Sequence, residues 1–327
     1  MKRVAYFLAW VSGLSALLRF SHRRSLTILL YHGVAPRTND PASIYNYRGK
    51  FIDPASFEKQ LSYWKKHYTI LPLERAFEAM QKGTLSKRAL ALTFDDGYEN
   101  TYRHAFPILR KLWLPATVFV TTNFILRGEA LWVDRLEYAL DAGIGTRAQR
   151  AALDAQTREK LKHLDPAIRE RTLREFEKKR SLRDFEDERI VYAPLTLAQM
   201  KEMEAHGIRF GAHTLTHPIL SHMGEQEAAD EIEKSKHDLE IHGFSLSPVF
   251  AYPNGQSGDW NGWTELALQK MGFAAALTTV EGWNTARTPP YRLHRFAMDR
   301  TGESIAEFAG IASGVRLYLS RIKKIFL

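Results

Sequence analysis

The sequence contains no cysteine. Its 327 residues therefore form no disulfide bond and offer no thiolate to a metal, so any metal ion must be held by His, Asp or Glu. The N-terminal region also lacks an apolar run long enough to cross a bilayer. The uncharged run from Val4 to Leu18 has 15 residues, whereas a membrane-spanning helix needs about 20.

The central part of the chain has no excess of charge of either sign. Residues 1–24 contain five basic residues and no acidic one, and residues 314–327 contain four basic residues and no acidic one. Together they account for the whole net charge of +9, so the remainder is neutral. A neutral body excludes an extended nucleic-acid-binding face, whereas basic ends interspersed with apolar residues suit an anionic membrane surface.

The N-terminal segment fits three interpretations. Lys2 and Arg3 precede an apolar stretch, as in a signal peptide, but no small-x-small cleavage site follows before Arg19. The second interpretation is a membrane anchor, which lies in or across the interface. The third is an ordinary packed helix. We expect a membrane-associated protein of the cell envelope, with the cytoplasmic face as the alternative.

Short apolar runs alternate with amphipathic helical patterns along the rest of the chain, which indicates an α/β fold with a parallel sheet, open or closed into a barrel. Strands are predicted over residues 26–30, 89–94, 116–121, 208–212, 248–252, 273–279 and 292–297. Helices are predicted over residues 54–66, 72–81, 100–112, 196–206, 225–242, 261–271 and 303–313.

Residues 134–190 interrupt this alternation, because they are highly charged, helix-prone and without a strand pattern. They are interpreted as a helical insertion, either a lid or a solvated helical hairpin without a role in binding. We therefore expect a basic and apolar segment at 1–25, one domain over 26–313 that includes this insertion, and a basic amphipathic tail at 314–327.

Four polar clusters each follow directly on a predicted strand. Since loops at the carboxyl ends of parallel strands share one rim, where ligands bind, the four clusters are expected to form one site. Each alone has a simpler explanation: Asp-Asp-Gly can be a turn with a helix cap, and a His pair can be structural. The clusters are Tyr31-His32-Gly33, Asp95-Asp96-Gly97, His213 with His217, and Tyr252-Pro253-Asn254-Gly255.

The set nevertheless fits hydrolysis of an amide. One Asp with two His supplies three ligands and leaves positions open for water and substrate, as in catalytic metal sites. The adjacent Asp can accept a proton from the attacking water, His32 can protonate the departing amine, and a backbone N–H near Pro253 and Asn254 can bind the oxyanion.

These residues resemble the polysaccharide deacetylases of the NodB-homology, or carbohydrate esterase 4, family. The resemblance covers about residues 26–300 and rests on Thr93-Phe94-Asp95-Asp96-Gly97, on His213-Thr214-Leu215-Thr216-His217 and on the loop from Phe250 to Gly255. It implies a distorted (β/α) barrel, Asp95 as general base, and Asp96, His213 and His217 as ligands of zinc or a related divalent ion.

Two departures from the family pattern concern the acid and the partner of the base. The late His motif is absent near Leu293-His294-Arg295, while Leu29 to Gly33 resembles the circularly permuted poly-β-1,6-N-acetylglucosamine deacetylases, which implies His32 as the acid. Ala251 stands where many members carry an Arg that contacts the base, and Arg295 is a candidate replacement.

The resulting expectation is metal-dependent hydrolysis of the N-acetyl amide of amino sugars in a polysaccharide or a lipid-linked glycan. The alternatives are a deformylase or another amide hydrolase on a lipid-linked amino sugar, and a non-catalytic glycan-binding module of the same fold. Four aromatic residues in loops near the predicted site are candidates for stacking on sugar rings or for plugging the core: Tyr252, Trp260, Trp263 and Trp283.

Overall fold

The structure is a computed structural model that describes residues 2–37, 46, 49–140, 145–178, 190–298 and 304–318. Part of the predicted insertion (141–144 and 179–189) and most of the predicted C-terminal tail (319–327) lie outside the described residues.

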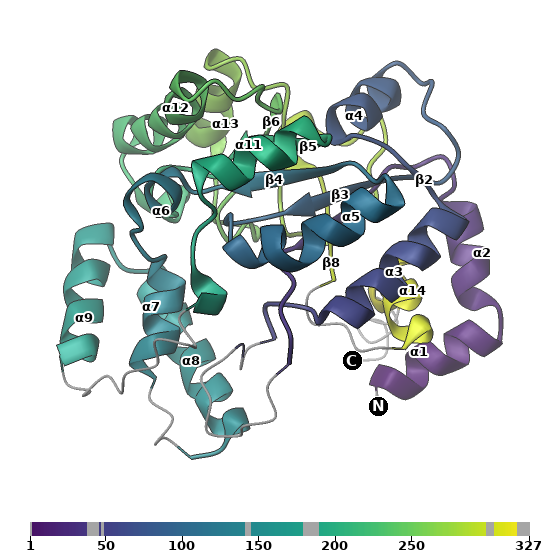
Figure 1. Cartoon of the computed structure of the whole chain (residues 1–327), viewed down its shortest axis with the longest axis horizontal. Coiled ribbons are helices and arrows are strands. Elements are labelled where there is room, and N and C mark those ends of the chain that lie inside the picture. Colours follow the sequence, from purple (N-terminus) through teal and green to yellow (C-terminus); the bar gives the residue numbers. More distant parts are fainter. Residues whose placement is uncertain are drawn as a thin grey trace.

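Within the described residues, eight strands, all paired in parallel, form the centre of the molecule (Figure 1). One sheet has the order β5-β4-β3-β1-β8, with β2 paired to the start of β3, and a second sheet consists of β6 and β7. The inner strands are fully buried because apolar residues occupy both faces. The strands are β1 (Thr27–Tyr31), β2 (Thr69–Ile70), β3 (Ala89–Phe94), β4 (Ala116–Val120), β5 (Ile208–Ala212), β6 (Val249–Ala251), β7 (Ala275–Leu277) and β8 (Phe296–Ala297).

The two sheets continue into one another as a distorted barrel. Parallel bridges link Leu277, at the end of β7, to Leu293 before β8, and Phe210 of β5 to Leu246 before β6. The bond from the Ser247 N–H to the Phe210 carbonyl, at 2.7 Å, is part of the second junction. Each junction is a single bridge rather than a ladder, so few backbone hydrogen bonds join the two sheets there. The predicted α/β barrel class is confirmed.

Helices cover the outside of the strands, and most begin and end within two residues of the predicted positions (Figure 1). β2 and α6 were not predicted, because two residues of strand and six of helix leave too little periodicity to recognise. The helices of the barrel are α3 (Pro54–His67), α4 (Leu73–Gln81), α5 (Phe106–Leu112), α6 (Thr122–Arg127), α11 (Leu197–Ala205), α12 (Glu225–Ile241), α13 (Gly262–Lys270) and α14 (Ile305–Ala312).

The predicted insertion is helical and packs against the barrel at one side. It comprises α7 (Trp132–Ala139), α8 (Arg147–Lys162) and α9 (Pro166–Lys178). Partly buried ion pairs hold it together: Arg158 of α8 binds Glu137 of α7 at 2.9 Å, and Arg135 binds Glu177 of α9 at 2.8 Å. The insertion is therefore an ordered layer of the structure over its described residues.

The N-terminal segment forms two short helices, α1 (Lys2–Val11) and α2 (Leu14–Ser21), which pack beside α14. Gly13 joins them with φ of +78°, a conformation that glycine adopts without strain. No described helix is by itself long and apolar enough to cross a membrane; α1 and α2 together reach that length and composition but are bent by 78°.

The contact between α1 and α14 depends on a glycine. A Cβ on Gly310 would lie 2.6 Å from Cδ1 of Tyr6, which is too close for two carbon atoms. We expect Gly310→Val to weaken this contact by about 1–3 kcal/mol through overpacking. Trypsin should then cut after the arginines of residues 1–24 severalfold faster, while the barrel unfolds at nearly the same temperature. Gly262→Val, where the added Cβ meets open space, is the control; equal cleavage of both variants would contradict the prediction.

Candidate active site

A pocket of about 550 Å³ opens at the carboxyl ends of the strands. This volume falls in the range of ligand pockets in enzymes, about 300–1,000 Å³. Each strand that contributes does so through its carboxyl-terminal residues or the residues that follow it, as the topology of a parallel barrel requires. These residues are His32 after β1, Asp95 and Asp96 after β3, His213 and His217 after β5, Asn254 and Gln256 after β6, Thr279 after β7, and Ala297 at the end of β8.

Asp95 faces a buried arginine. The guanidinium of Arg295 donates two hydrogen bonds to the carboxylate, at 2.7 Å to Oδ1 and 2.6 Å to Oδ2. Both side chains are inaccessible, at 2% for Asp95 and 0% for Arg295. Arg295 is held by its Nε–H, which donates to the Thr278 carbonyl at 2.8 Å. The structure thus places Arg295 against Asp95, and this paired fork fixes the orientation of the carboxylate.

Asp96 turns the opposite way, toward two imidazoles. Its Oδ1 lies 3.4 Å from Nε2 of His213 and 3.4 Å from Nε2 of His217. Two ligands on one tetrahedral zinc ion are separated by about 3.3–3.5 Å, so the donor atoms stand at the spacing that a shared ion requires. Among the described residues, these three are the only group of His, Cys, Asp or Glu that could hold a metal ion.

The protonation states of this group suit cation binding. Burial would raise the pKa of Asp96, but the imidazoles of His213 and His217 hold it well below its ordinary value. Burial lowers the pKa of His217, and the pKa stays below its ordinary value although the Asp96 carboxylate raises it. His213 Nδ1 lies 2.7 Å from the Ala251 carbonyl; a hydrogen bond donated there leaves the Nε2 lone pair facing Asp96. Asp96 thus presents an anionic ligand and His217 a neutral one, and together with the imidazole of His213 the set fits a divalent ion.

Backbone strain concentrates around these ligands. Of seven described non-glycine residues with positive φ, four lie in the loops of the pocket: Asp96, Thr214, His217 and Asn254. Such conformations cost on the order of 1 kcal/mol each and persist only where surrounding contacts enforce them. The divergence of Asp95 and Asp96 follows from this strain, since Asp96 at +76° and Gly97 at +91° bend the chain just after β3.

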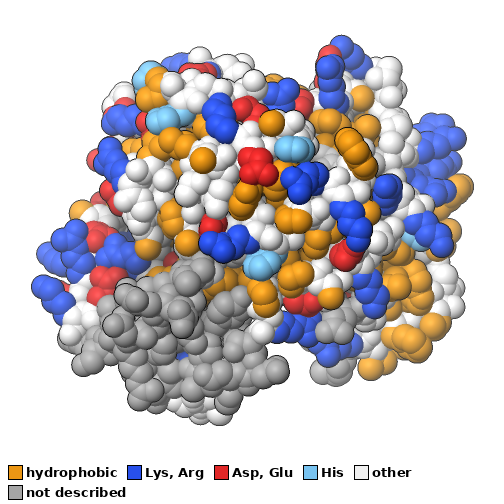
Figure 2. Space-filling view, in the orientation of Figure 1, with side chains coloured by type: hydrophobic (Ala, Val, Ile, Leu, Met, Phe, Trp, Pro, Cys, Tyr) orange, Lys and Arg blue, Asp and Glu red, His pale blue; other side chains and the backbone are white. Residues whose placement is uncertain are grey.

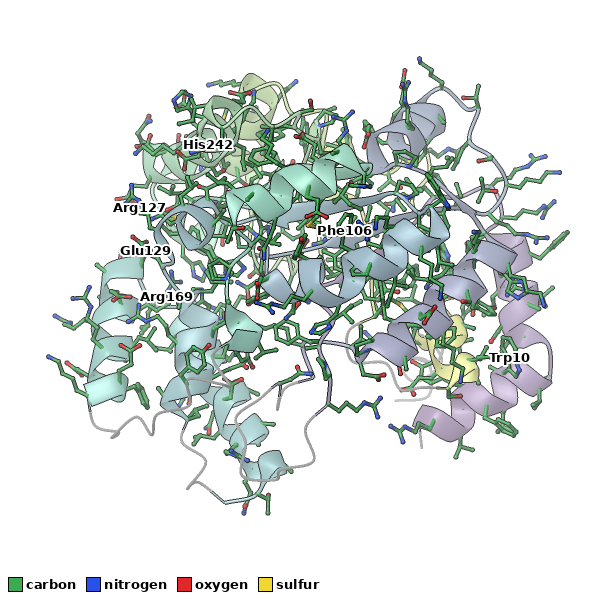
Figure 3. All side chains as sticks on the ribbon, viewed as in Figure 1. Trp10, Phe106, Arg127, Glu129, Arg169 and His242 are labelled. Atoms are coloured by element: carbon green, nitrogen blue, oxygen red, sulfur yellow. The ribbon has the colours of Figure 1, made fainter. Side chains whose placement is uncertain are left out.

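The loop that carries both His residues is held from two sides. The carboxylate of Glu231, on α12, accepts from the N–H groups of Leu215 and Thr216 at 3.0 and 2.9 Å. From the insertion, Nε1–H of Trp132 donates to the His217 carbonyl at 3.1 Å. The Trp132 ring is covered in turn by the guanidinium of Arg169, 4.9 Å away, whose position Figure 3 labels. The insertion thus helps to orient a ligand of the candidate metal site.

The loop after β6 offers fewer oxyanion donors than the sequence suggested. The N–H of Tyr252 donates to the Leu277 carbonyl, the N–H of Gly255 donates to the Pro253 carbonyl, and Pro253 has no N–H. Asn254 is therefore the remaining candidate within Tyr252 to Asn254. Its side chain lines the pocket, and its Nδ2 finds no acceptor among the described residues.

The aromatic residues proposed for sugar stacking lie elsewhere. The ring of Tyr252 is fully buried and stacked on Trp260 at 5.1 Å, and Trp283 is stacked on His22 at 3.5 Å. Neither these rings nor that of Trp263 belongs to the lining of the pocket. The Tyr252 side chain therefore lies outside the lining of this pocket, and its role toward the substrate stays a prediction.

Several lining residues could not be predicted from motifs. Lys50, before α3, is partly buried and binds Asp134 and the Tyr98 hydroxyl. Burial would lower its pKa, but the carboxylates of Asp134 and Glu137 outweigh burial and raise it, so the ammonium stays charged. The insertion adds further walls, Val133, Glu137 and Arg158, and the two ends of the chain add Tyr6, Glu307, Ile311 and Arg316.

This fold and this site define a class of enzyme: an α/β-barrel hydrolase with an arginine-bound carboxylate beside an Asp-His-His ligand group. A family model described as polysaccharide deacetylase matches residues 82–276, more than half of the chain. The chain belongs to the polysaccharide deacetylase family, and it is a hydrolase of carbon–nitrogen bonds other than peptide bonds. The predicted family is confirmed.

Individual relatives agree with this assignment. The Bacillus subtilis protein YxkH, named as a polysaccharide deacetylase, is 23% identical over 86% of this chain and 74% of its own length. The poly-β-1,6-N-acetyl-D-glucosamine N-deacetylase of Staphylococcus epidermidis is 32% identical, but the match spans only 32% of this chain and 38% of that protein.

Two solved structures share the fold. The Streptococcus pyogenes deacetylase PplD, in complex with acetate, superposes with a TM-score of 0.59 at 22% identity over 85% of this chain and 95% of its own. IcaB from Ammonifex degensii gives a TM-score of 0.59 at 22% identity over 88% and 97%.

The pair of Asp95 and Arg295 should contribute strongly to stability. Arg295→Gln leaves a buried carboxylate without its cation, which costs about 3–5 kcal/mol, measured as the free energy of unfolding in urea. Arg292→Gln is the matched control, since Arg292 pairs with Glu265 at the surface, where such a pair contributes at most about 1 kcal/mol. Equal losses in the free energy of unfolding would contradict the prediction, because the buried pair would then stabilise the fold no more than the surface pair.

Proposed function

We propose that this protein is a divalent-metal-dependent N-deacetylase of amino sugars in a polysaccharide or a lipid-linked glycan. The observation that carries the proposal is the meeting of two functional groups in one pocket. The Asp-His-His group suits a cation, and next to it stands a carboxylate oriented by a buried arginine. The likeness of one segment to an N-deacetylase of poly-β-1,6-N-acetyl-D-glucosamine supports that polymer as the first substrate to test.

Each side chain has a definite task in this scheme. Asp96, His213 and His217 hold the ion, with zinc as the first candidate, and a bound divalent ion acts as a Lewis acid on the acyl carbonyl. Asp95 accepts the proton of the attacking water, and Arg295 keeps its carboxylate in place. His32 donates the proton to the departing amine, and Asn254 donates a hydrogen bond to the oxyanion.

Another amide hydrolase, such as a deformylase on a lipid-linked amino sugar, uses the same groups and differs only in the acyl group that the pocket accepts. A non-catalytic glycan-binding module has no use for a base, three ligands and an acid in one pocket. We therefore propose a hydrolase rather than a binding module. The acid released in the reaction identifies the acyl group that the enzyme removes. We also propose that the protein acts at an anionic membrane surface of the cell envelope, which the basic residues at both ends of the chain support.

The direct test is release of acetate from N-acetylated oligosaccharides, with formylated and longer acylated analogues in parallel. We expect acetate from the N-acetylated series, loss of activity on treatment with a chelator, and recovery on addition of zinc or another divalent ion. Activity that survives complete removal of metal would overturn the metal-dependent scheme. Formate as the preferred product would select the alternative.

The base and the ligands should separate experimentally. Asp95→Asn removes the proton acceptor, so turnover should fall about 10²–10⁴-fold while zinc is still bound in equilibrium dialysis. The double variant His213→Ala with His217→Ala should lose both turnover and zinc, because two of three ligands are gone. Full turnover of the Asp95→Asn variant would remove Asp95 from the mechanism.

A further inference from the structure

The two N-terminal helices expose an apolar surface that the barrel does not cover. Seven large hydrophobic side chains on α1 and α2 are 40–63% exposed: Val4, Phe7, Leu8, Val11, Leu14, Leu17 and Phe20. Figure 2 shows hydrophobic side chains gathered where Figure 1 places α1 and α2, with basic side chains at their border. We call these seven residues the hairpin surface.

The opposite side of the same helices is also apolar. Tyr6, Ala9 and Leu18 are buried in the core cluster that includes Phe308 of α14. Trp10, labelled in Figure 3, lies 6.0 Å from the ring of Tyr63 on α3. A helix that is apolar all round is either enclosed by protein or in contact with lipid, and here only one side is enclosed.

The length of the two helices decides whether they can cross a bilayer or can only lie at its surface. A helix rises about 1.5 Å per residue, so α1 and α2 span about 15 and 12 Å, less than the hydrocarbon core of about 30 Å. The bend of 78° at Gly13 prevents them from forming one straight span. A bent pair with one side fixed to the protein suits a position in the plane of the interface.

The charges beside the hairpin surface indicate the kind of membrane. Residues 1–24 contain no acidic side chain. Arg3 is 83% exposed, and Arg24 is exposed at the end of the segment. Two acidic residues that line the pocket, Glu307 and Glu281, are paired with Arg3 and Arg316, respectively. The outward charge is therefore basic, which complements anionic lipid headgroups.

The hairpin is at the same time a wall of the active site. Tyr6 of α1 lines the pocket together with Glu307 and Ile311 of α14, and with Asp95 and His32. A helix with its side chains is about 10 Å thick, so a bilayer in contact with the outer side of α1 lies about that far from the pocket. A glycan carried by a lipid of that bilayer could enter the pocket without leaving the surface.

We propose that α1 and α2 dock in the interface of an anionic bilayer through the hairpin surface and so present the active site to amino sugars attached to lipid. The substrate part of this inference rests on the proposed deacetylase activity, whereas the docking part does not. Both can be tested on the full chain.

The experiment compares two double variants. Phe7→Gln with Leu17→Gln removes two of the most exposed members of the hairpin surface. Ile241→Gln with Leu266→Gln makes the same chemical change on α12 and α13, at 62% and 49% exposure and away from the hairpin (Figure 1). Binding is measured by co-sedimentation with vesicles of phosphatidylcholine, with and without phosphatidylglycerol, at low and high salt. Unfolding curves confirm that both variants are folded.

We expect the unaltered protein and the control to bind the anionic vesicles at low salt. The hairpin variant should bind about a hundredfold more weakly, since it loses two apolar contacts and each is worth about one power of ten. Equal binding of both variants, or no binding by the unaltered protein, would overturn the docking. The docking would also be overturned if the unaltered chain formed a soluble dimer and the hairpin variant were a monomer. The surface would then be a contact between two copies.

Turnover separates this inference from the proposed function. Deacetylation is measured on one N-acetylated oligosaccharide, either free in solution or attached to a lipid chain in the vesicles. The hairpin variant should keep its rate on the free form and lose about tenfold on the lipid-attached form. Equal rates on both forms would overturn the role of the hairpin in substrate delivery. Absence of product from either form, with vesicle binding intact, would instead overturn the proposed deacetylase.

Discussion

Two adjacent carboxylates point to opposite partners, and the remainder of the active site depends on this divergence. Asp95 faces the guanidinium of Arg295, and Asp96 faces His213 and His217. Side by side and unpaired, two buried carboxylates would repel each other, and one would take up a proton. The positive φ of Asp96 turns the chain so that each carboxylate meets its own partner. The fold therefore provides each of the two neighbouring carboxylates with a separate partner.

The burial that gives these charges their strength also makes them costly. A buried ion pair contributes to stability only if its remaining hydrogen-bonding groups are satisfied. Arg295 meets this condition through the Thr278 carbonyl and the Thr93 hydroxyl. In the His loop, Glu231 and Trp132 satisfy backbone groups, the N–H of Leu215 and the carbonyl of His217. The insertion thus belongs to the construction of the site, since its first turn contacts the backbone of a ligand residue.

The pocket is closed by segments from both ends of the sequence. α1 and α14 pack together, and the ion pairs of Arg3 with Glu307 and of Arg316 with Glu281 lie at the edge of this wall. A wall made in this way is an addition to the barrel, because the strands and their loops already place the base and the ligands. Its inner side lines the pocket and its outer side is apolar, so one thin layer of helix separates the chemistry from whatever covers the outside.

The strands, most helices and the motif residues could be foreseen from the sequence, because hydrophobic periodicity and strand-end polar clusters are local patterns. The motifs also placed Asp96, His213 and His217 together, since loops after parallel strands share one rim. Other features are set by contacts between residues far apart in the chain. Such contacts stack Tyr252 on Trp260 and bond the N–H of Tyr252 to the Leu277 carbonyl of β7. They also bring Lys50 to Asp134 and place Tyr6 in the lining of the pocket. Periodicity shows which side of a helix is apolar, but only tertiary packing decides what covers that side. Because α1 is apolar on both sides, its sequence does not show which side packs against the protein.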